Sequence, residues 1–277
     1  MRKFYFVCFA FLVLLSQVSA QTKGIATFGQ LKNLEFVQEF YNGGTGSMGS
    51  GPGKDLQLQF TPNAQVIVSA SKGGSGNFIN NPGGYPVLFF QTGTDVVVNA
   101  IAHVSVGLWF TYSALQQGTA TVYAGPNGTG TVLATITLSL NNSGCNTYKM
   151  CVWTPMAVPL TTPAGSIRFS GTANFLAIGA IHLGMKIPTA TGLTSSLNPS
   201  AQGQQVTFTA TVTATGAVPA GTVRFKAGNR VLAEVPVVGG VASLTTSSLP
   251  VGSMKISAIF RGTGFFGTQA TLFQQVN

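Results

Sequence analysis

Side chains that could exchange protons are scarce in this sequence. Beyond residue 20 the chain carries five carboxylates and two histidines: Glu35, Glu39, Asp55, Asp95, Glu234, His103 and His182. Glycoside hydrolysis needs two carboxyl groups that face each other across a cleft, about 5 to 10 Å apart. Glu35 and Glu39 are close in sequence, but on a strand they would lie roughly 13 Å apart. We therefore interpret both as solvated residues near a loop.

The two histidines lack the sequence context of a catalytic base or a metal ligand. His182 alternates with apolar neighbours in Ala180-Ile-His-Leu-Gly184, which predicts a position on the outer face of a strand. His103 follows a long apolar run, at an expected turn. Neither lies in a His-x-x-x-His motif or in a recognisable triad. We expect two surface histidines, no bound metal, no cofactor and no enzymatic activity.

Cys145 and Cys151 are the cysteines that remain once Cys8, in the first twenty residues, is set aside. In an oxidising compartment such a pair most simply forms one disulfide that closes a small loop. The alternative, a metal site, would need further ligands, and no histidine or third cysteine is nearby in the sequence. We predict a disulfide that contributes about 2–3 kcal/mol and mainly fixes a loop.

The first twenty residues have the layout of a secretory signal peptide. Arg2 and Lys3 precede an apolar run at 4–15, and Val18-Ser-Ala20 forms a small-residue cleavage site. The apolar run is shorter than the roughly 20 residues that a spanning helix needs, so cleavage after Ala20 is favoured over an uncleaved anchor. No later segment is long and apolar enough to span a bilayer. We expect export through the Sec pathway, to the extracellular space or the cell surface.

The remaining chain is basic, but its charges are sparse. Twelve basic and five acidic side chains follow residue 20, a net charge of about +7. Such an excess could attract polyanions, yet only Arg224, Lys226 and Arg230 lie close together in the sequence. We interpret the excess as a contribution to solubility. The partners we expect are an extracellular polysaccharide or a surface protein, and not nucleic acid.

Short alternating runs separated by Gly, Pro and Asn predict an all-β protein. Only 7% of the residues are charged, but 45% are hydrophobic, and their alternation favours folded sheets over disorder. We divide the chain into a signal peptide at 1–20, a jelly-roll-like β-sandwich at 21–186 and an Ig-like β-sandwich at 187–277. In the first sandwich, strands are predicted at 25–28, 36–41, 56–60, 66–70, 87–91, 95–102, 107–113, 120–124, 132–138, 152–158, 166–169 and 175–183.

Seven strands are predicted in the second sandwich, at 191–197, 206–212, 222–225, 231–237, 242–245, 254–260 and 272–276. The sequence there lacks the Cys…Trp…Cys pattern of antibody domains, so packing alone must hold the two sheets together. The residues expected in its core are Phe208, Val212, Phe225, Leu244, Ile256 and Phe260.

Aromatic residues are the strongest candidates for a binding site, because sugar C–H groups stack on ring faces while hydroxyl groups meet polar side chains. Alternation puts Trp109 and Thr111 on one face of 107–113, opposite three bulky residues of the same strand. We expect Trp109 and Trp153 in the core, where large aromatics supply most of the burial. Residues near turns are expected to be exposed and are our candidate ligand-binding set: Tyr41, Asn42, Tyr85 and Tyr148.

The C-terminal ninety residues carry phrases that resemble the bacterial Ig-like repeat domain, of the group 3 type. These are Thr191-Gly-Leu-Thr-Ser-Ser-Leu-Asn-Pro-Ser200, Gln205-Val-Thr-Phe-Thr-Ala-Thr-Val212, Ala220-Gly-Thr-Val-Arg-Phe-Lys226 and Ser247-Ser-Leu-Pro-Val-Gly-Ser253. The resemblance implies a spacer or adhesion unit outside the cytoplasm.

The first domain resembles the jelly-roll ectodomains of exported bacterial proteins that carry a PEP-CTERM sorting tail. The matching phrases are Phe40-Tyr-Asn-Gly-Gly-Thr45, Gly73-Gly-Ser-Gly-Asn-Phe78, Val87-Leu-Phe-Phe90, the segment 119–130, Gly144-Cys145, Cys151-Val-Trp-Thr-Pro155 and Gly171-Thr-Ala-Asn174. Such domains often have acidic residues on adjacent first and last strands that ligate calcium. Phe28-Gly29 and Ile178-Gly179 stand at these positions here, so the hard oxygen ligands are missing and we expect no calcium. The sorting tail is also absent, which favours a released or non-covalently held protein, unless the sequence is part of a longer one.

These observations together predict an exported, non-enzymatic protein. One hypothesis is glycan or matrix binding through the first sandwich, with the Ig-like domain as a spacer. The alternative is a purely structural or adhesive role without a ligand site. Convergence of the three tyrosines of the candidate set on one groove would favour the first hypothesis, and their scatter the second.

Overall fold

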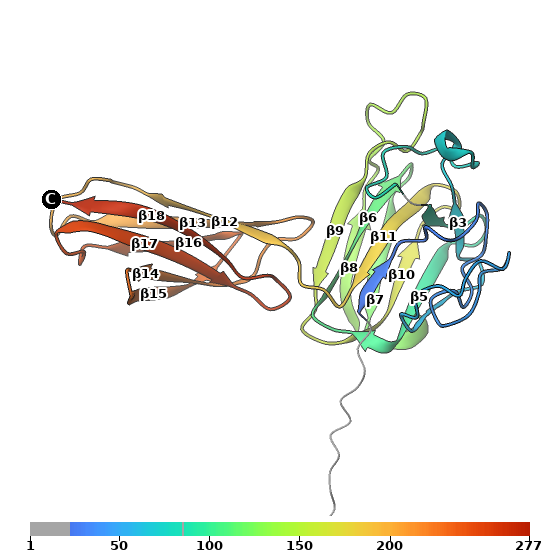
Figure 1. Cartoon of the computed structure of the whole chain (residues 1–277), viewed down its shortest axis with the longest axis horizontal. Coiled ribbons are helices and arrows are strands. Elements are labelled where there is room, and N and C mark those ends of the chain that lie inside the picture. Colours follow the sequence, from blue (N-terminus) through green and yellow to red (C-terminus); the bar gives the residue numbers. More distant parts are fainter. Residues whose placement is uncertain (1–22, 85) are drawn as a thin grey trace, which may run out of the picture.

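The computed structural model describes residues 23–84 and 86–277, which form two β-sandwiches joined in series (Figure 1). The predicted signal peptide and Tyr85 lie outside the described residues. The all-β fold class is confirmed. Within the described part of the chain, no helix has the length and hydrophobicity needed to cross a membrane.

The first sandwich consists of strands β1 to β11. Their bounds are β1 Gly24–Ala26, β2 Leu58–Phe60, β3 Gln65–Ile67, β4 Val87–Phe89, β5 Asp95–Val104, β6 Gly107–Ala114, β7 Gly118–Tyr123, β8 Val132–Leu138, β9 Thr154–Pro159, β10 Ala164–Ser170 and β11 Leu176–Leu183. Two single 3₁₀ turns, at Ala70–Lys72 and Pro126–Gly128, interrupt the loops.

The strands of the first sandwich form two antiparallel sheets around one apolar core. One sheet has the order β3-β4-β11-β6-β9, with β1 also paired to β11, and the other has the order β2-β5-β10-β7-β8. Phe110 of β6 and Phe169 of β10 meet edge to face between the sheets, with ring centroids 5.0 Å apart. The alternation of 107–113 is confirmed on its inner side, where Leu108, Phe110 and Tyr112 are buried in this core.

The strand predicted at 36–41 is not formed. Residues 37–43 follow a series of turns, and Phe36 makes only an isolated bridge to Gln65. Within this segment, the backbone of Gln38 takes a positive φ of 48°, which lies outside the extended region of regular strands. Val37, Phe40 and Tyr41 of this segment are still buried in the core, whereas Phe36 is exposed.

The second sandwich consists of strands β12 to β18, and all seven predicted strands are present. Their bounds are β12 Thr189–Ser195, β13 Val206–Ala214, β14 Gly221–Ala227, β15 Arg230–Val237, β16 Val241–Thr246, β17 Gly252–Arg261 and β18 Thr268–Val276. They form sheets of order β12-β13-β16 and β15-β14-β17-β18. The predicted core is confirmed except at Leu244, which is half-buried.

The two sandwiches meet through short backbone contacts. The Ala157 N–H of β9 donates to the Gly216 carbonyl of the second sandwich at 2.9 Å. A Cβ atom on Gly264 would lie 2.6 Å from the Val106 carbonyl oxygen, and both Gly216 and Gly264 have positive φ values. These glycines let backbone approach backbone, so the joint is a close contact. Figure 1 shows the second sandwich extending away from it, with the C-terminus at the remote end.

Candidate functional site

A row of outward-facing residues crosses one sheet of the first sandwich. Strand register places Ile25 of β1 opposite His182 of β11, His182 opposite Trp109 of β6, and Trp109 opposite Ala157 of β9. The inner neighbours along these strands are buried in the core, so the row faces outward. Its last member, Ala157, is the residue that bonds to the second sandwich. The row therefore runs from one edge of the sheet to the joint.

Trp109 and His182 form an aromatic stack at the centre of this row. Their ring centroids lie 3.3 Å apart with an interplanar angle of 12°. Burial lowers the pKa of His182 from its ordinary value of 6.5 to about 4, because the cationic form is poorly solvated there. His182 is thus neutral at physiological pH. Its Nδ1 atom is buried and has no hydrogen-bond partner among the described residues.

A cavity of about 310 Å³ opens over this stack, and we call it the outer-face groove. It is lined by residues of β1, β6, β11 and the loop before β4: Ile25, Thr27, Pro82, Gly83, Trp109, Thr111, Ala180 and His182. Among the described residues that line the groove, His182 is the ionisable one. The groove therefore offers ring and aliphatic surface with two hydroxyl groups, and no formal charge at neutral pH.

Trp109 also contributes to the joint between the sandwiches. It is half-buried, and it packs against the apolar cluster of the second sandwich, to which Ala157 and Ala217 also belong. The expectation that Trp109 lies in the core of the first sandwich is wrong. Its ring lies on the outer face, between the groove and the second sandwich.

A second cavity lies at the loop end of the first sandwich. Its volume is about 430 Å³, and its lining includes the polar residues Ser69, Ser71, Lys72 and Asn80 together with Phe78. Ile79, Asn80, Asn81, Gly84 and Pro86 form one side of this cavity, and Pro82 and Gly83 of the same loop line the outer-face groove instead. One loop thus borders both cavities.

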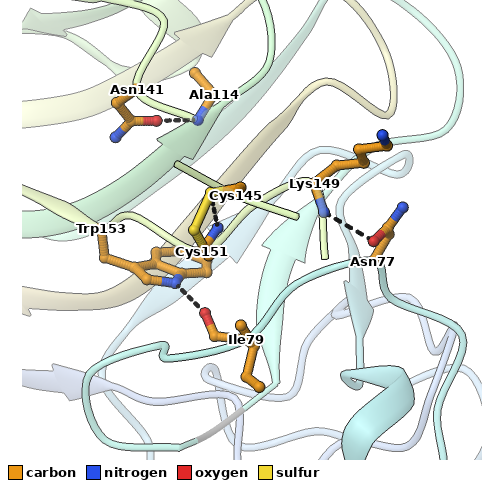
Figure 2. Close-up of a disulfide and its surroundings, with 8 residues drawn as sticks. All are labelled: Asn77, Ile79, Ala114, Asn141, Cys145, Lys149, Cys151 and Trp153. Atoms are coloured by element: carbon orange, nitrogen blue, oxygen red, sulfur yellow. Dashed lines mark hydrogen bonds between the residues drawn. A yellow bond between two sulfur atoms is a disulfide. The ribbon is translucent and has the colours of Figure 1, made fainter. Parts of the chain in front are cut away.

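The predicted disulfide is present beside this loop end, as Figure 2 shows. Cys145 and Cys151 are bonded, and the Trp153 indole N–H donates to the Ile79 carbonyl at 2.9 Å. The Lys149 backbone N–H donates to the Asn77 side chain at 2.9 Å. These bonds tie the disulfide loop to the 77–79 segment. Trp153 is half-buried in a small separate cluster and is not in the main core.

The three described members of the candidate ligand-binding set do not converge on a groove. Tyr41 was expected to be exposed but is 4% exposed, its ring packs edge to face on Phe28, and its hydroxyl oxygen accepts the Phe28 N–H at 2.7 Å. Burial raises the pKa of Tyr41 to about 12. Asn42 is half-buried and donates to Glu39, and Tyr148 is half-buried on the disulfide loop. Neither the outer-face groove nor the loop-end cavity is lined by any of these three residues.

Glu35 is a second correction, because it is fully buried and not solvated. Its carboxylate accepts four hydrogen bonds, from the backbone N–H groups of Lys32, Met48 and Ser50 and from the Ser50 hydroxyl. Burial raises its pKa, but these hydrogen bonds outweigh that effect and hold the pKa below the ordinary value of 4.5. Every lone-pair direction is thus used to hold the 31–50 loop together, and the group is not available as a base.

The residues that sequence reasoning missed are His182 and the groove side of Trp109. Alternation predicted that His182 faces outward from its strand, which agrees with its place in the row opposite Trp109, whereas Trp109 was expected in the core. The pairing of β6 with β11, which stacks the Trp109 ring on the His182 ring, is a long-range property that a local sequence pattern does not predict. Within the described residues, no group of three or more His, Cys, Asp or Glu side chains is placed to hold a metal ion.

Comparisons with known proteins give weak structural similarity and one domain match. No curated protein has a significantly similar sequence. The chain resembles an Endo-D glycoside hydrolase domain from Streptococcus pneumoniae R6 with 12% identity and a TM-score of 0.28, covering 79% of this chain but only 37% of that one. A family 6 carbohydrate-binding module aligns with 11% identity and a TM-score of 0.30, covering 59% of this chain and 94% of that module.

The N-terminal domain of a Streptococcus gordonii adhesin aligns with 11% identity and a TM-score of 0.25, covering 70% of this chain and 62% of that one. Similarity at this level does not identify a function. The sequence match is more informative, because it covers nearly all of the second sandwich. Residues 193–277 match the family model of the bacterial Ig-like domain, group 3.

Proposed function

We propose that this protein is an exported, non-enzymatic protein of the cell surface or extracellular space that binds a neutral polysaccharide. The binding site is the outer-face groove of the first sandwich, and the Ig-like sandwich acts as the adjoining spacer. One observation carries the proposal: the stacked Trp109 and His182 rings line a groove without formal charge. The sequence features of export and the Cys145–Cys151 disulfide support an extracellular location.

The chemistry of the groove selects for a neutral, hydroxylated ligand. Aromatic edges and the side chains of Ile25 and Pro82 offer apolar contact to sugar C–H groups. The hydroxyl groups of Thr27 and Thr111 can donate or accept hydrogen bonds. A carboxylate or sulfate would find no cation in this lining and would lose its hydration without compensation. The groove is small and open, so we expect weak affinity for each site and stronger retention on a polymer.

The lining residues offer no carboxylate pair and no nucleophile with an adjacent base, which supports binding over hydrolysis. Thr111 is a polar residue of the groove lining and is 9% exposed. Its replacement by Val keeps the shape and removes the hydroxyl, which makes it the most selective probe of ligand binding.

A purely structural role is the second candidate. Its support is the packing of Trp109 against the second apolar cluster and the backbone hydrogen bond between Ala157 and Gly216. In that case the stack serves to hold the sandwiches in a fixed orientation, and the groove is a by-product of the joint.

Calorimetric titration of purified residues 21–277 with soluble neutral polysaccharides (dextran, laminarin, mannan and xylan) separates the two candidates. We expect saturable binding to at least one polymer, lost in His182→Ala and reduced in Thr111→Val. His103→Ala is the matched control, since His103 is exposed on β5 of the other sheet. Absence of binding to every polymer, or equal loss in the control, would refute the binding site. A His182→Ala protein that binds nothing but shows a changed small-angle scattering profile would instead support the structural role.

A further inference from the structure

The charges of the second sandwich are confined to one of its two sheets. Strands β12, β13 and β16 contain no charged residue. The charged residues of the second sandwich all belong to β14, β15 and β17: Arg224, Lys226, Arg230, Glu234, Lys255 and Arg261. The sandwich thus has one sheet of threonine, serine and apolar residues and one basic sheet.

Strand alternation directs four of these cations to the same outer face. Phe225, Ile256 and Phe260 are buried in the core, so the residues between them point away from it. Register places Arg261 opposite Thr222, and Ile259 opposite Arg224, along β14 and β17. We call this surface the basic face, and it contains Arg224, Lys226, Lys255 and Arg261.

The single carboxylate of the basic face does not neutralise it. Glu234 pairs with Arg224 across β14 and β15. Among the described residues, Lys226, Lys255 and Arg261 form no ion pair. The face therefore holds three uncompensated positive charges, and Phe273 of β18, opposite Lys255, is 68% exposed beside them.

The basic face continues into a cleft at the joint between the sandwiches. The cleft has a volume of about 630 Å³ and is lined by Val106 and Leu160 of the first sandwich, by Lys186, and by the segments 221–222 and 261–264 of the second. Lys186 and Arg261 thus approach one cavity from separate segments, and no carboxylate lines it. Two cations that converge without an acidic partner repel each other, and a bound anion would relieve that repulsion.

We propose that the cleft and the basic face form a binding site for an anionic polysaccharide. A carboxylate or sulfate group enters the cleft between Arg261 and Lys186, where a guanidinium can hold it by two hydrogen bonds. The Thr222 and Thr263 side chains supply further hydroxyl groups at the cleft. The polymer then follows β14 and β17 past Lys226 and Lys255, and the exposed Phe273 ring offers a stacking surface for a sugar.

The same observations disfavour nucleic acid. Single-stranded binding surfaces use several aromatic rings on which successive bases stack, whereas the aromatic residues of β14 and β17, Phe225 and Phe260, are buried. This site shares no residue with the outer-face groove. The two binding proposals can therefore be tested independently of each other.

The test is affinity electrophoresis of the purified protein in gels containing polygalacturonate, alginate or neutral dextran, followed by titration at two salt concentrations. We expect retardation by the acidic polymers that weakens at high salt. The double variant Lys186→Gln/Arg261→Gln should lose about tenfold in affinity. The matched control is Lys72→Gln/Lys149→Gln, which removes the same charge from two exposed lysines of the first sandwich.

Thermal unfolding checks that every variant is folded, and His182→Ala should retain acidic-polymer binding. Three results would overturn the proposal: no retardation by either acidic polymer, equal weakening in the control variant, or tighter binding to single-stranded DNA or anionic vesicles than to the polysaccharides. Equal weakening would show that net charge alone is responsible, without a built site.

Discussion

Replacing Glu35 by Gln tests how strongly one buried carboxylate holds the 31–50 loop. Oε1 accepts the Met48 and Ser50 N–H groups, and Oε2 accepts the Lys32 N–H and the Ser50 hydroxyl. A glutamine NH₂ group cannot accept, so the best amide orientation leaves the Lys32 N–H without its acceptor while the serine hydroxyl rotates. One unpaired buried donor and three weakened bonds should cost roughly 2–4 kcal/mol.

The assay is thermal unfolding followed by circular dichroism, with hydrogen exchange at the Met48 and Ser50 amides. A domain of this size loses about 2–4 °C in Tm for each kcal/mol of lost stability. The Tm of the first sandwich should therefore fall by about 5–15 °C. Glu39→Gln is the matched control. Glu39 is exposed and bonded to Asn42, and its replacement should change stability by less than about 0.5 kcal/mol.

The pH dependence of this difference gives a sharper test. The pKa of Glu35 is lowered on folding from 4.5, so its stabilising contribution is fully present above pH 4.5 and is lost as the pH falls through the folded-state pKa. The stability gap between the wild type and Glu35→Gln should therefore be constant near neutral pH and shrink in acid. A gap that does not change with pH, or one no larger than that of Glu39→Gln, would refute the reasoning.

Three further predictions concern the disulfide, the aromatic stack and the joint. Cys145→Ser/Cys151→Ser should lower the free energy of unfolding of the first sandwich by about 2 kcal/mol, since the bond closes a short loop of six-residue separation. An unchanged Tm for that sandwich would contradict this. Burial lowers the pKa of His182 from 6.5 to about 4, so as the pH falls the unfolded state binds a proton at this residue before the folded state does. The free energy of unfolding should therefore decrease as the pH is lowered from 6.5 to 4. His182→Phe should abolish that component in a titration of Tm against pH, and an unchanged slope would exclude His182 as its source. Gly216→Val should separate the sandwiches, because φ is +76° and the new Cβ would lie 2.7 Å from the Pro155 carbonyl oxygen. Small-angle scattering should then show a broader distribution of shapes with unchanged circular dichroism, and an identical profile would argue against the close joint.

The strands and the second core were predictable because alternation is a local property. Phe208 and Phe225 each stand between polar residues in β-rich runs, and each is fully buried. The segment 36–41 shows where this reasoning fails. It carries apolar residues at strand-like spacing, but the Glu35 carboxylate binds backbone groups 13 and 15 residues further on, and that long-range bond selects turns over a strand.

The candidate site was less predictable, because it depends on which strands become neighbours. Tyr41 precedes Asn-Gly-Gly, a turn signal that predicts exposure, but Phe28 and Phe60 enclose its ring. Trp109 and His182 are 73 positions apart in the sequence, and only the pairing of β6 with β11 stacks them. Alternation assigns each residue a face of its strand, while register and interdomain packing decide what that face meets.

The first and last strands of the second sandwich have a mechanical consequence. β12 and β18 lie side by side, and hydrogen bonds join Thr191 to Thr268 near one end and Ser195 to Gln274 near the other. Residue numbers rise in the same direction along both strands, so the strands are parallel. A pull applied at the start of β12 and the end of β18 would load these bonds in shear, all at once, and not one after another as in a zipper. Under such a pull, the polar seam between these two edge strands would resist separation as a clamp.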